Sequence, residues 1–130
     1  MPWDDSPAGG FTAPGVRAWP PAQDAPDRNV AVQREDPGSV LAFCRDLLRL
    51  RKSESGRRLG EYHSLSAPAG VWRYSTGGLA VAANLTNRLV RLPNVSGEVL
   101  LSTAADRDGA AGSRLPGQVT LEPWEGVITS

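Results

Sequence analysis

The fold is decided by residues 70–85, which read GVWRYSTGGLAVAANL. Gly70–Ser75 and Leu79–Leu85 are short runs rich in aromatic and aliphatic residues, and the pair Gly77 and Gly78 stands between them. Two such runs, separated by a glycine turn, predict two neighbouring β-strands. This stretch therefore favours β-structure for the part of the chain around it.

Short strand-like runs continue on both sides of this stretch and are separated by Gly, Pro and Asn. They are Gly60–Leu65, Leu89–Leu92, Gly97–Ser102, Gln118–Leu121 and Gly126–Thr129. With the two runs above they make seven short strands, and no repeat period links them. Many short strands broken by turn residues predict a mainly β unit, an antiparallel β-sandwich of the Greek-key type, over residues 57–130.

A helical period appears only in residues 36–53. Asp36 is a suitable N-cap, and Pro37 suits the first helical position. Apolar residues then recur every three or four positions and form one stripe, as expected of an amphipathic helix; they are Val40, Leu41, Cys44, Leu47 and Leu48. A small sandwich covers only part of such a stripe, so we expect self-association through this helix face.

The first 35 residues hold six of the eleven prolines and show no periodicity. We expect them to lack regular structure. Disorder and a functional loop are both compatible with this composition, although Trp3, Phe11 and Trp19 argue against disorder, since disordered segments are poor in aromatic residues.

Composition excludes several function classes. Fourteen basic and fourteen acidic side chains cancel, so nothing draws the chain to nucleic acid or to an anionic membrane. No run approaches the roughly 18 apolar residues of a membrane span. The single Cys44 allows no internal disulfide and fits a reducing, cytoplasmic compartment. His63, the only histidine, has no metal-type neighbour, so we expect neither a metal nor a cofactor.

Three motifs, in this order, resemble the C-terminal portion of alpha-glucosidases and oligo-1,6-glucosidases of the alpha-amylase family of glycoside hydrolases. The first is the set Met1, Trp3, Asp4, Ser6, Pro7, Gly10, Phe11 and Thr12. The second is Asp36-Pro37-x-Ser39-x-Leu41, and the third is the closing run Leu121–Glu125. The resemblance implies a loop region after the last barrel strand at 1–35, the last helix of a truncated (β/α)8 barrel at 36–56, and a C-terminal β-sandwich at 57–130.

The family implies hydrolysis of alpha-glucosidic bonds in oligosaccharides with retention, by two carboxyl groups about 5 Å apart. In the family these acids follow earlier barrel strands, so no catalytic residue is assigned here and the chain alone is expected to be inactive. Met1 matches an internal Met of the motif, which suggests a mis-called start or a truncated gene. Oligosaccharide would then be bound through a missing or separately encoded barrel. The alternative is a stand-alone carbohydrate-binding or barrel-docking β-sandwich module.

The resemblance also supplies candidate binding residues. Trp3, Asp4 and Phe11 are expected to bind substrate, because the family loop borders the glucose pocket; packing of this loop against the barrel is the competing interpretation. Trp72 and Trp124 could present sugar-binding rings, but burial in the sandwich core is favoured. The specificity loops are not in the sequence, so maltose, isomaltose, sucrose and trehalose remain open as substrates.

Overall fold

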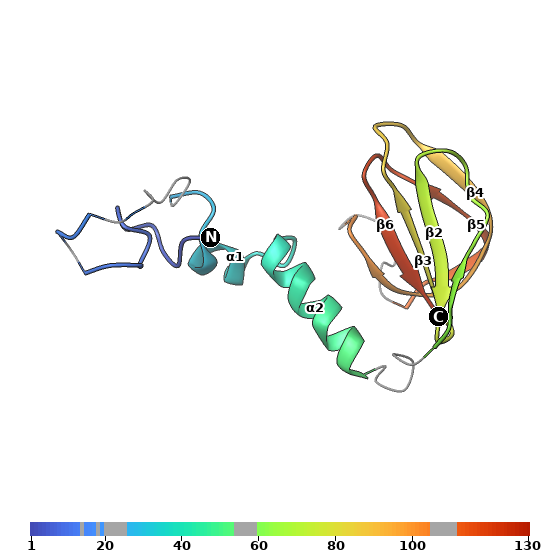
Figure 1. The fold of residues 1–130 in the computed structure, drawn as a ribbon, viewed down its shortest axis with the longest axis horizontal. Coiled ribbons are helices and arrows are strands. Elements are labelled where there is room, and N and C mark those ends of the chain that lie inside the picture. The colour runs from blue at the N-terminus through green and yellow to red at the C-terminus, as the bar shows by residue number, and fades with distance from the viewer. Residues whose placement is uncertain (14, 18, 20–25, 54–59, 105–111) are drawn as a thin grey trace. The chain divides into compact units, whose positions relative to one another are not determined.

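The computed structural model describes residues 1–13, 15–17, 19, 26–53, 60–104 and 112–130 (Figure 1). The chain divides into two compact units, Met1–Asp46 and Leu47–Ser130. The helices are α1 (Val30–Glu35) and α2 (Val40–Ser53). The strands are β1 (Tyr62–Ser64), β2 (Val71–Thr76), β3 (Leu79–Asn84), β4 (Val90–Ser102), β5 (Arg114–Leu121) and β6 (Gly126–Thr129).

The second unit is a single antiparallel sheet in the order β1-β2-β3-β6-β4-β5. The prediction of a mainly β, antiparallel fold is confirmed. After the β4–β5 hairpin the chain returns and places β6 between β3 and β4, so the order is not that of a simple meander. This non-sequential pairing is the kind of return that Greek-key folds use.

Within the described residues the sheet has six strands and not seven, because two predicted strands, Leu89–Leu92 and Gly97–Ser102, are the ends of one strand, β4. Asn94 has a φ of 57°, and the pairing register shifts between Pro93 and Val95. A bulge of this kind bends a strand without ending it. The first part of β4 pairs with β5, and its last part pairs with β6.

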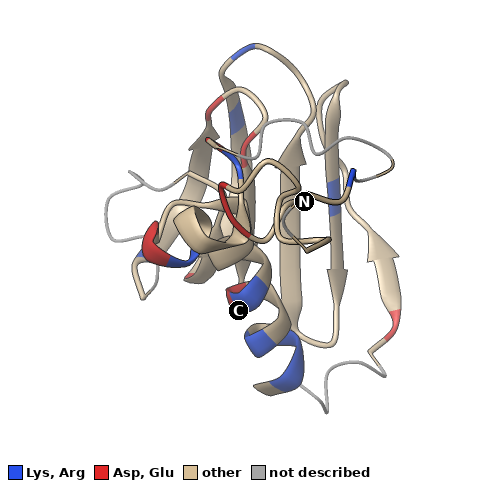
Figure 2. Ribbon diagram, turned by 90° about the vertical axis from the view of Figure 1, so that its left-hand side faces the viewer, with Lys and Arg blue, Asp and Glu red and all other residues tan. Residues whose placement is uncertain are grey.

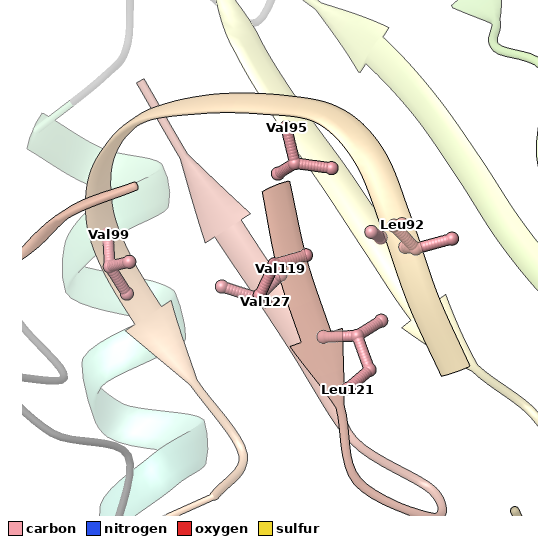
Figure 3. Packing of buried hydrophobic residues seen from close by; sticks show 7 residues of the cluster. Leu92, Val95, Val99, Val119, Leu121 and Val127 are labelled. Atoms are coloured by element: carbon pink, nitrogen blue, oxygen red, sulfur yellow. The ribbon is translucent and has the colours of Figure 1, made fainter. Parts of the chain in front are cut away.

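The curvature of β4 folds the sheet around its own core (Figure 3). Figure 3 shows Leu92 and Val99 near opposite ends of the arch, with Val119, Leu121 and Val127 between them. Val95 and Ala82 complete the buried cluster. Burial of each such Val or Leu side chain is worth about 1.5–3 kcal/mol, so this cluster is the main source of stability of the sheet.

One buried polar side chain fastens the connection between β3 and β4. Asn84 is 1% exposed, and its Nδ2 donates to the carbonyl oxygens of Arg88 (2.7 Å) and Glu122 (2.8 Å). Its Oδ1 accepts from the backbone N–H of Thr86 (3.0 Å) and from the Thr86 hydroxyl (2.7 Å). The side chain is fully satisfied, as a buried amide must be to avoid a desolvation penalty.

The first unit contains a helix that the sequence pattern does not reveal. α1 has six residues, and its N-cap is Asn29, whose side chain accepts from the Val32 N–H at 2.8 Å. The prediction that residues 1–35 lack regular structure is therefore wrong at 30–35. A helix shorter than two turns is too brief to display a hydrophobic period.

α2 begins at Val40, three residues after the predicted first helical residue, Pro37. The Ser39 hydroxyl accepts from the Ala42 N–H at 3.2 Å, which is the role of an N-cap. Asp36 is instead the C-cap of α1, and its carboxylate accepts from Gly38 N–H at 2.8 Å within a turn. Residues 54–56 of the predicted helical region lie outside the described residues.

α2 has no buried residue, and Val40, Leu47 and Leu48 are exposed. Basic residues recur on the helix, with Arg51 and Lys52 in its last turn, whereas charges of both signs are scattered over the strands (Figure 2). None of the helices in the described parts of the chain combines the length and apolarity that a membrane crossing requires.

Candidate substrate-binding loop

The three predicted binding residues lie in one tightly turned loop, residues 1–13, that is closed by its own backbone. The Trp3 N–H donates to the Gly9 carbonyl at 2.7 Å. The Gly9 N–H in turn donates to the Ser6 carbonyl at 2.7 Å. The Phe11 N–H donates to Ala8 at 3.1 Å. These bonds bring Trp3 beside Gly9 and fix where Phe11 leaves the turn.

Ser6 joins the acidic residue of the loop to its glycine pair. Its hydroxyl donates to Asp4 Oδ1 at 2.5 Å and accepts from the Gly10 N–H at 3.0 Å. The Ser6 N–H also donates to Asp4 Oδ1, at 3.0 Å. These two bonds to Asp4 both use Oδ1, and Oδ2 lies next to Gly10.

The hydrogen bonds from the Ser6 hydroxyl, and next from the Ser6 amide, lower the pKa of Asp4 below its ordinary value. They do so because they favour the charged form of the carboxyl. The contribution of this carboxylate to loop order is therefore complete above the ordinary aspartate pKa. It is lost as the pH falls through the lowered value. At neutral pH Asp4 is a fixed negative charge and an acceptor, not a proton donor.

Gly10 allows the loop to fold this tightly. Its φ is +74°, and a Cβ placed there would lie 2.9 Å from both Asp4 Oδ2 and Trp3 Cβ. Any other residue would therefore displace two of the predicted binding residues. The glycine is needed both for its left-handed backbone and for the space it leaves.

α1 anchors the loop to the rest of the first unit. The Pro2 carbonyl accepts from the Val30 N–H at 2.9 Å, and the Trp3 carbonyl accepts from the Ala31 N–H at 3.0 Å. The loop thus occupies the free N–H groups of the first helical turn. The sequence pattern does not predict the supporting roles of Ser6 and α1. The one signal for α1 in the sequence is Asn29, because Asn is a common N-cap residue.

The rings of the loop face solvent. Trp3 and Phe11 are each 55% exposed, and Asp4 between them is partly exposed. Exposed aromatic rings can stack on the C–H face of a sugar, and an ionised carboxylate in the same loop can accept from its hydroxyl groups. Among the described residues no cluster of three or more His, Cys, Asp and Glu could hold a metal ion.

The sheet carries a second group of exposed aromatic residues. Trp72 is 53% exposed and Trp124 is 67% exposed, so the favoured prediction that both lie in the core is wrong. Alternation along β2 puts Trp72 and Tyr74 on one face and Val71, which packs on the core, on the other. Alternation of side chains along the predicted strand would have placed Trp72 on the opposite face from Val71.

Two polar side chains of β1 and β2, His63 and Arg73, contact other groups of the same unit. The Arg73 guanidinium donates to the carbonyl oxygens of Pro93 (3.2 Å) and Asn94, and so ties β2 to the bulge of β4. It lines a surface groove of about 710 Å³ together with residues 65–68, Ala80 and 92–96. His63 lies on β1, and its Nε2 is 3.8 Å from Glu61 Oε2.

Comparison with known proteins identifies the sheet unit. The pattern of the family described as "Domain of unknown function (DUF3459)" matches residues 57–128, more than half of the chain. The chain belongs to the DUF3459 family. In this DUF3459 chain the matched region begins before β1 and ends within β6, one residue before that strand ends, so it contains the first five strands and the whole buried core.

Similarity extends beyond the DUF3459 domain to the loop and helices. The chain is 32% identical over 139 residues to an alpha-glucosidase of Schizosaccharomyces pombe, covering 98% of this chain and 23% of that enzyme. It is 33% identical over 138 residues to an oligo-1,6-glucosidase of Parageobacillus thermoglucosidasius, with 98% and 24% covered. The resemblance seen in the sequence motifs is thereby confirmed. The chain spans about a quarter of the length of these relatives.

Solved structures give the same result for the fold. A trehalulose synthase crystallised with Tris superimposes with a TM-score of 0.81 at 25% identity, over 98% of the DUF3459 chain and 24% of that enzyme. Another trehalulose synthase structure, in complex with sucrose, gives a TM-score of 0.76 at 26% identity over the same shares. The chain thus corresponds to a C-terminal portion of alpha-amylase-family enzymes.

Proposed function

We propose that this chain is the C-terminal part of a retaining alpha-glucosidase-type glycoside hydrolase that cleaves alpha-glucosidic bonds in oligosaccharides. The observation that carries the proposal is similarity to alpha-glucosidases along 98% of the chain, loop and helices included. A module that shared only the β domain with these enzymes would not retain the Trp3–Phe11 loop.

In this proposal the catalytic acid and nucleophile are supplied by a barrel outside the described residues. They cleave the bond through a covalent glycosyl intermediate. The chain itself has two tasks. α2 packs its apolar stripe on the barrel, and the loop of residues 1–13 forms part of the rim of the glucose pocket. The partner is an oligosaccharide, and the chain alone is inactive.

At the pocket, Trp3 and Phe11 would stack on the sugar, while ionised Asp4 would accept from a sugar hydroxyl. Three observations support these roles: both rings are 55% exposed, Ser6 holds the Asp4 carboxylate, and Gly10 leaves room for Trp3 and Asp4. A site whose own hydrogen bonds are already made loses less entropy when substrate binds. We place the enzyme in the cytoplasm because its one cysteine, Cys44, suits a reducing compartment.

A chimera tests the proposal. The matching C-terminal quarter of the P. thermoglucosidasius oligo-1,6-glucosidase is replaced by this chain, and hydrolysis of isomaltose and of p-nitrophenyl alpha-glucoside is measured. We expect activity well above that of the same enzyme lacking the quarter. A chimera that is folded by circular dichroism and yet inactive would show that the chain is not the equivalent segment.

Two variants of the chimera test the loop. Trp3→Ala should raise KM about tenfold, the loss of roughly 1.4 kcal/mol of binding. Trp19→Ala removes the same side chain from a position that is 90% exposed, and should leave KM unchanged. Equal effects of the two variants would remove Trp3 from the pocket and leave it a role in packing only.

A further inference from the structure

Three aromatic side chains of β1 and β2 form one continuous cluster, Tyr62–Trp72–Tyr74. The ring centroids of Tyr62 and Tyr74 are 5.2 Å apart at an interplanar angle of 31°, and those of Trp72 and Tyr74 are 5.0 Å apart at 36°. Trp72 Nε1 donates to Tyr62 Oη at 3.4 Å. Ring contact and the hydrogen bond hold the three side chains in a fixed arrangement.

The cluster lies on the sheet face that points away from the core. Tyr62 is paired with Thr76, and Tyr74 with Val81, while Arg73 is paired with the core residue Ala82. Because successive strand residues point to opposite faces, Trp72 and Tyr74 share the outer face with Tyr62. Tyr62 and Trp72 are 54% and 53% exposed, and every residue of β1 is exposed.

The surroundings of the cluster are uncharged, with hydroxyl groups on β1 and β2 and the aliphatic partners Val81 and Ala83 on β3. Ser64 is paired with Tyr74 across the two strands, and Thr76 is paired with Tyr62. Because paired residues point to the same face, these two hydroxyl groups share the face of the cluster. The charged or titratable neighbours Glu61, His63 and Arg73 occupy the alternate positions and belong to the other face. Exposed aromatic faces bordered by hydroxyl groups suit a ligand with an apolar C–H face and a rim of hydroxyls.

We propose that the Tyr62–Trp72–Tyr74 cluster is a glucan-binding surface, separate from the loop of residues 1–13. Glucose rings would stack on the exposed parts of the indole and phenol rings, and their hydroxyls would bond to Ser64 and to the tyrosine hydroxyls. The Thr76 hydroxyl donates to the Gly60 carbonyl at 3.0 Å and would accept from a sugar hydroxyl. Three rings in mutual contact present more aromatic surface than a single ring does, which suits an oligosaccharide better than a monosaccharide. Only the choice of an alpha-linked glucan rests on the proposed function; the surface itself does not.

Affinity electrophoresis of the full chain in gels containing amylopectin, with dextran as a second alpha-glucan, tests this site. Wild-type protein should be retarded, and Trp72→Ala should weaken the affinity about tenfold, the usual scale for loss of a central aromatic contact. Trp124→Ala is the matched control, because Trp124 is 67% exposed on the β5–β6 turn and outside the cluster; its retardation should equal wild type.

If Trp72→Ala fails to fold, Tyr62→Ala on the edge strand β1 tests the cluster instead, and it should also weaken retardation. Trp72→Phe keeps an aromatic ring and should retain most of the binding. Absence of retardation of the wild type, or equal losses in the Trp72 and Trp124 variants, would overturn the proposal. A change of oligomeric state on Trp72→Ala without loss of retardation would assign the cluster to a protein contact and would also overturn it. Because the assay requires no hydrolysis, its result is independent of the chimera activity.

Discussion

At the scale of single residues, two glycines of the sheet share one backbone conformation and differ in their surroundings. Gly97 has a φ of +114° and Gly117 a φ of +110°, both within the region that L side chains rarely adopt. A Cβ at Gly117 would meet nothing within 4 Å, whereas a Cβ at Gly97 would collide with the backbone oxygen of Ser130. The pair therefore separates backbone strain from steric exclusion.

We expect Gly117→Ala to lower the free energy of unfolding by about 1–3 kcal/mol, the cost of a strained φ. Gly97→Ala should cost about 2 kcal/mol more, because Ser130, held by its N–H to the Glu98 carbonyl at 3.0 Å, must move. Urea unfolding followed by tryptophan fluorescence measures both. Equal losses of stability would mean that Ser130 moves away at no cost. Backbone strain alone would then explain the need for glycine at position 97.

The sequence predicted candidate binding residues in the loop of residues 1–13, but it did not predict the contacts that hold them. Trp3, Asp4 and Phe11 stood out by residue type and by their place in a motif. Ser6 and Gly10 act through a hydroxyl bridge and a missing Cβ, and both depend on how the turn closes. The aromatic cluster was missed for a related reason: Tyr62 joins Trp72 and Tyr74 only through strand pairing between β1 and β2.

At the scale of elements, α2 is capped by Ser39 and not by Asp36, the N-cap that the sequence predicted. Ser39 is buried, and its hydroxyl donates to the Gln33 carbonyl at 2.7 Å while it caps α2. The Gln33 side-chain carbonyl in turn accepts from the Leu41 N–H at 3.1 Å. Ser39 thus couples the end of α1 to the beginning of α2.

Ser39→Ala should cost about 1 kcal/mol, the usual loss on removal of a serine cap, and should speed hydrogen exchange at the Ala42 amide. Asp36→Ala is the matched control. It removes the residue that the sequence favoured as cap, but leaves the Ser39 bond intact, so exchange at Ala42 should stay close to wild type. Faster exchange in the Asp36 variant than in the Ser39 variant would restore the earlier helix start.

Sequence reasoning predicted most strands because glycine and proline interrupt a run wherever the chain turns. It failed where one strand bends and continues. Pro93 and Asn94 have the composition of a turn, and Asn94 does adopt a positive φ, yet pairing with β5 resumes at Val95. Only the partner strands decide whether such a dipeptide ends a strand or bulges it, and partners are not encoded locally.

At the scale of the whole molecule, the apolar stripe of α2 should control solubility. Val40, Leu47 and Leu48 are 73%, 38% and 53% exposed. Several large apolar side chains on one helix face form a surface that associates or aggregates unless it is covered. We expect the isolated chain to elute from size exclusion as oligomers whose size depends on concentration.

Leu47→Lys combined with Leu48→Glu keeps the net charge and should convert these oligomers to a monomer. The near-UV circular dichroism of the sheet should not change, since its core lies in β3–β6. Arg45→Gln, on the polar side of the same helix, is the control and should leave association unchanged. A monomeric wild type whose sheet unfolds in the double variant would show that α2 is covered within the chain.

The position of β6 has a consequence for how the protein is made. β6 is synthesised after the other five described strands, yet it pairs with both β3 and β4 in the middle of the sheet. Until it arrives, the hairpins β2–β3 and β4–β5 have no described strand between them, and each presents an open edge to other nascent chains. The described sheet therefore cannot be completed before β6 has been synthesised, and its final pairing step depends on Gly126–Thr129. A growing polypeptide of this kind is a natural client for chaperones that shield unpaired strands.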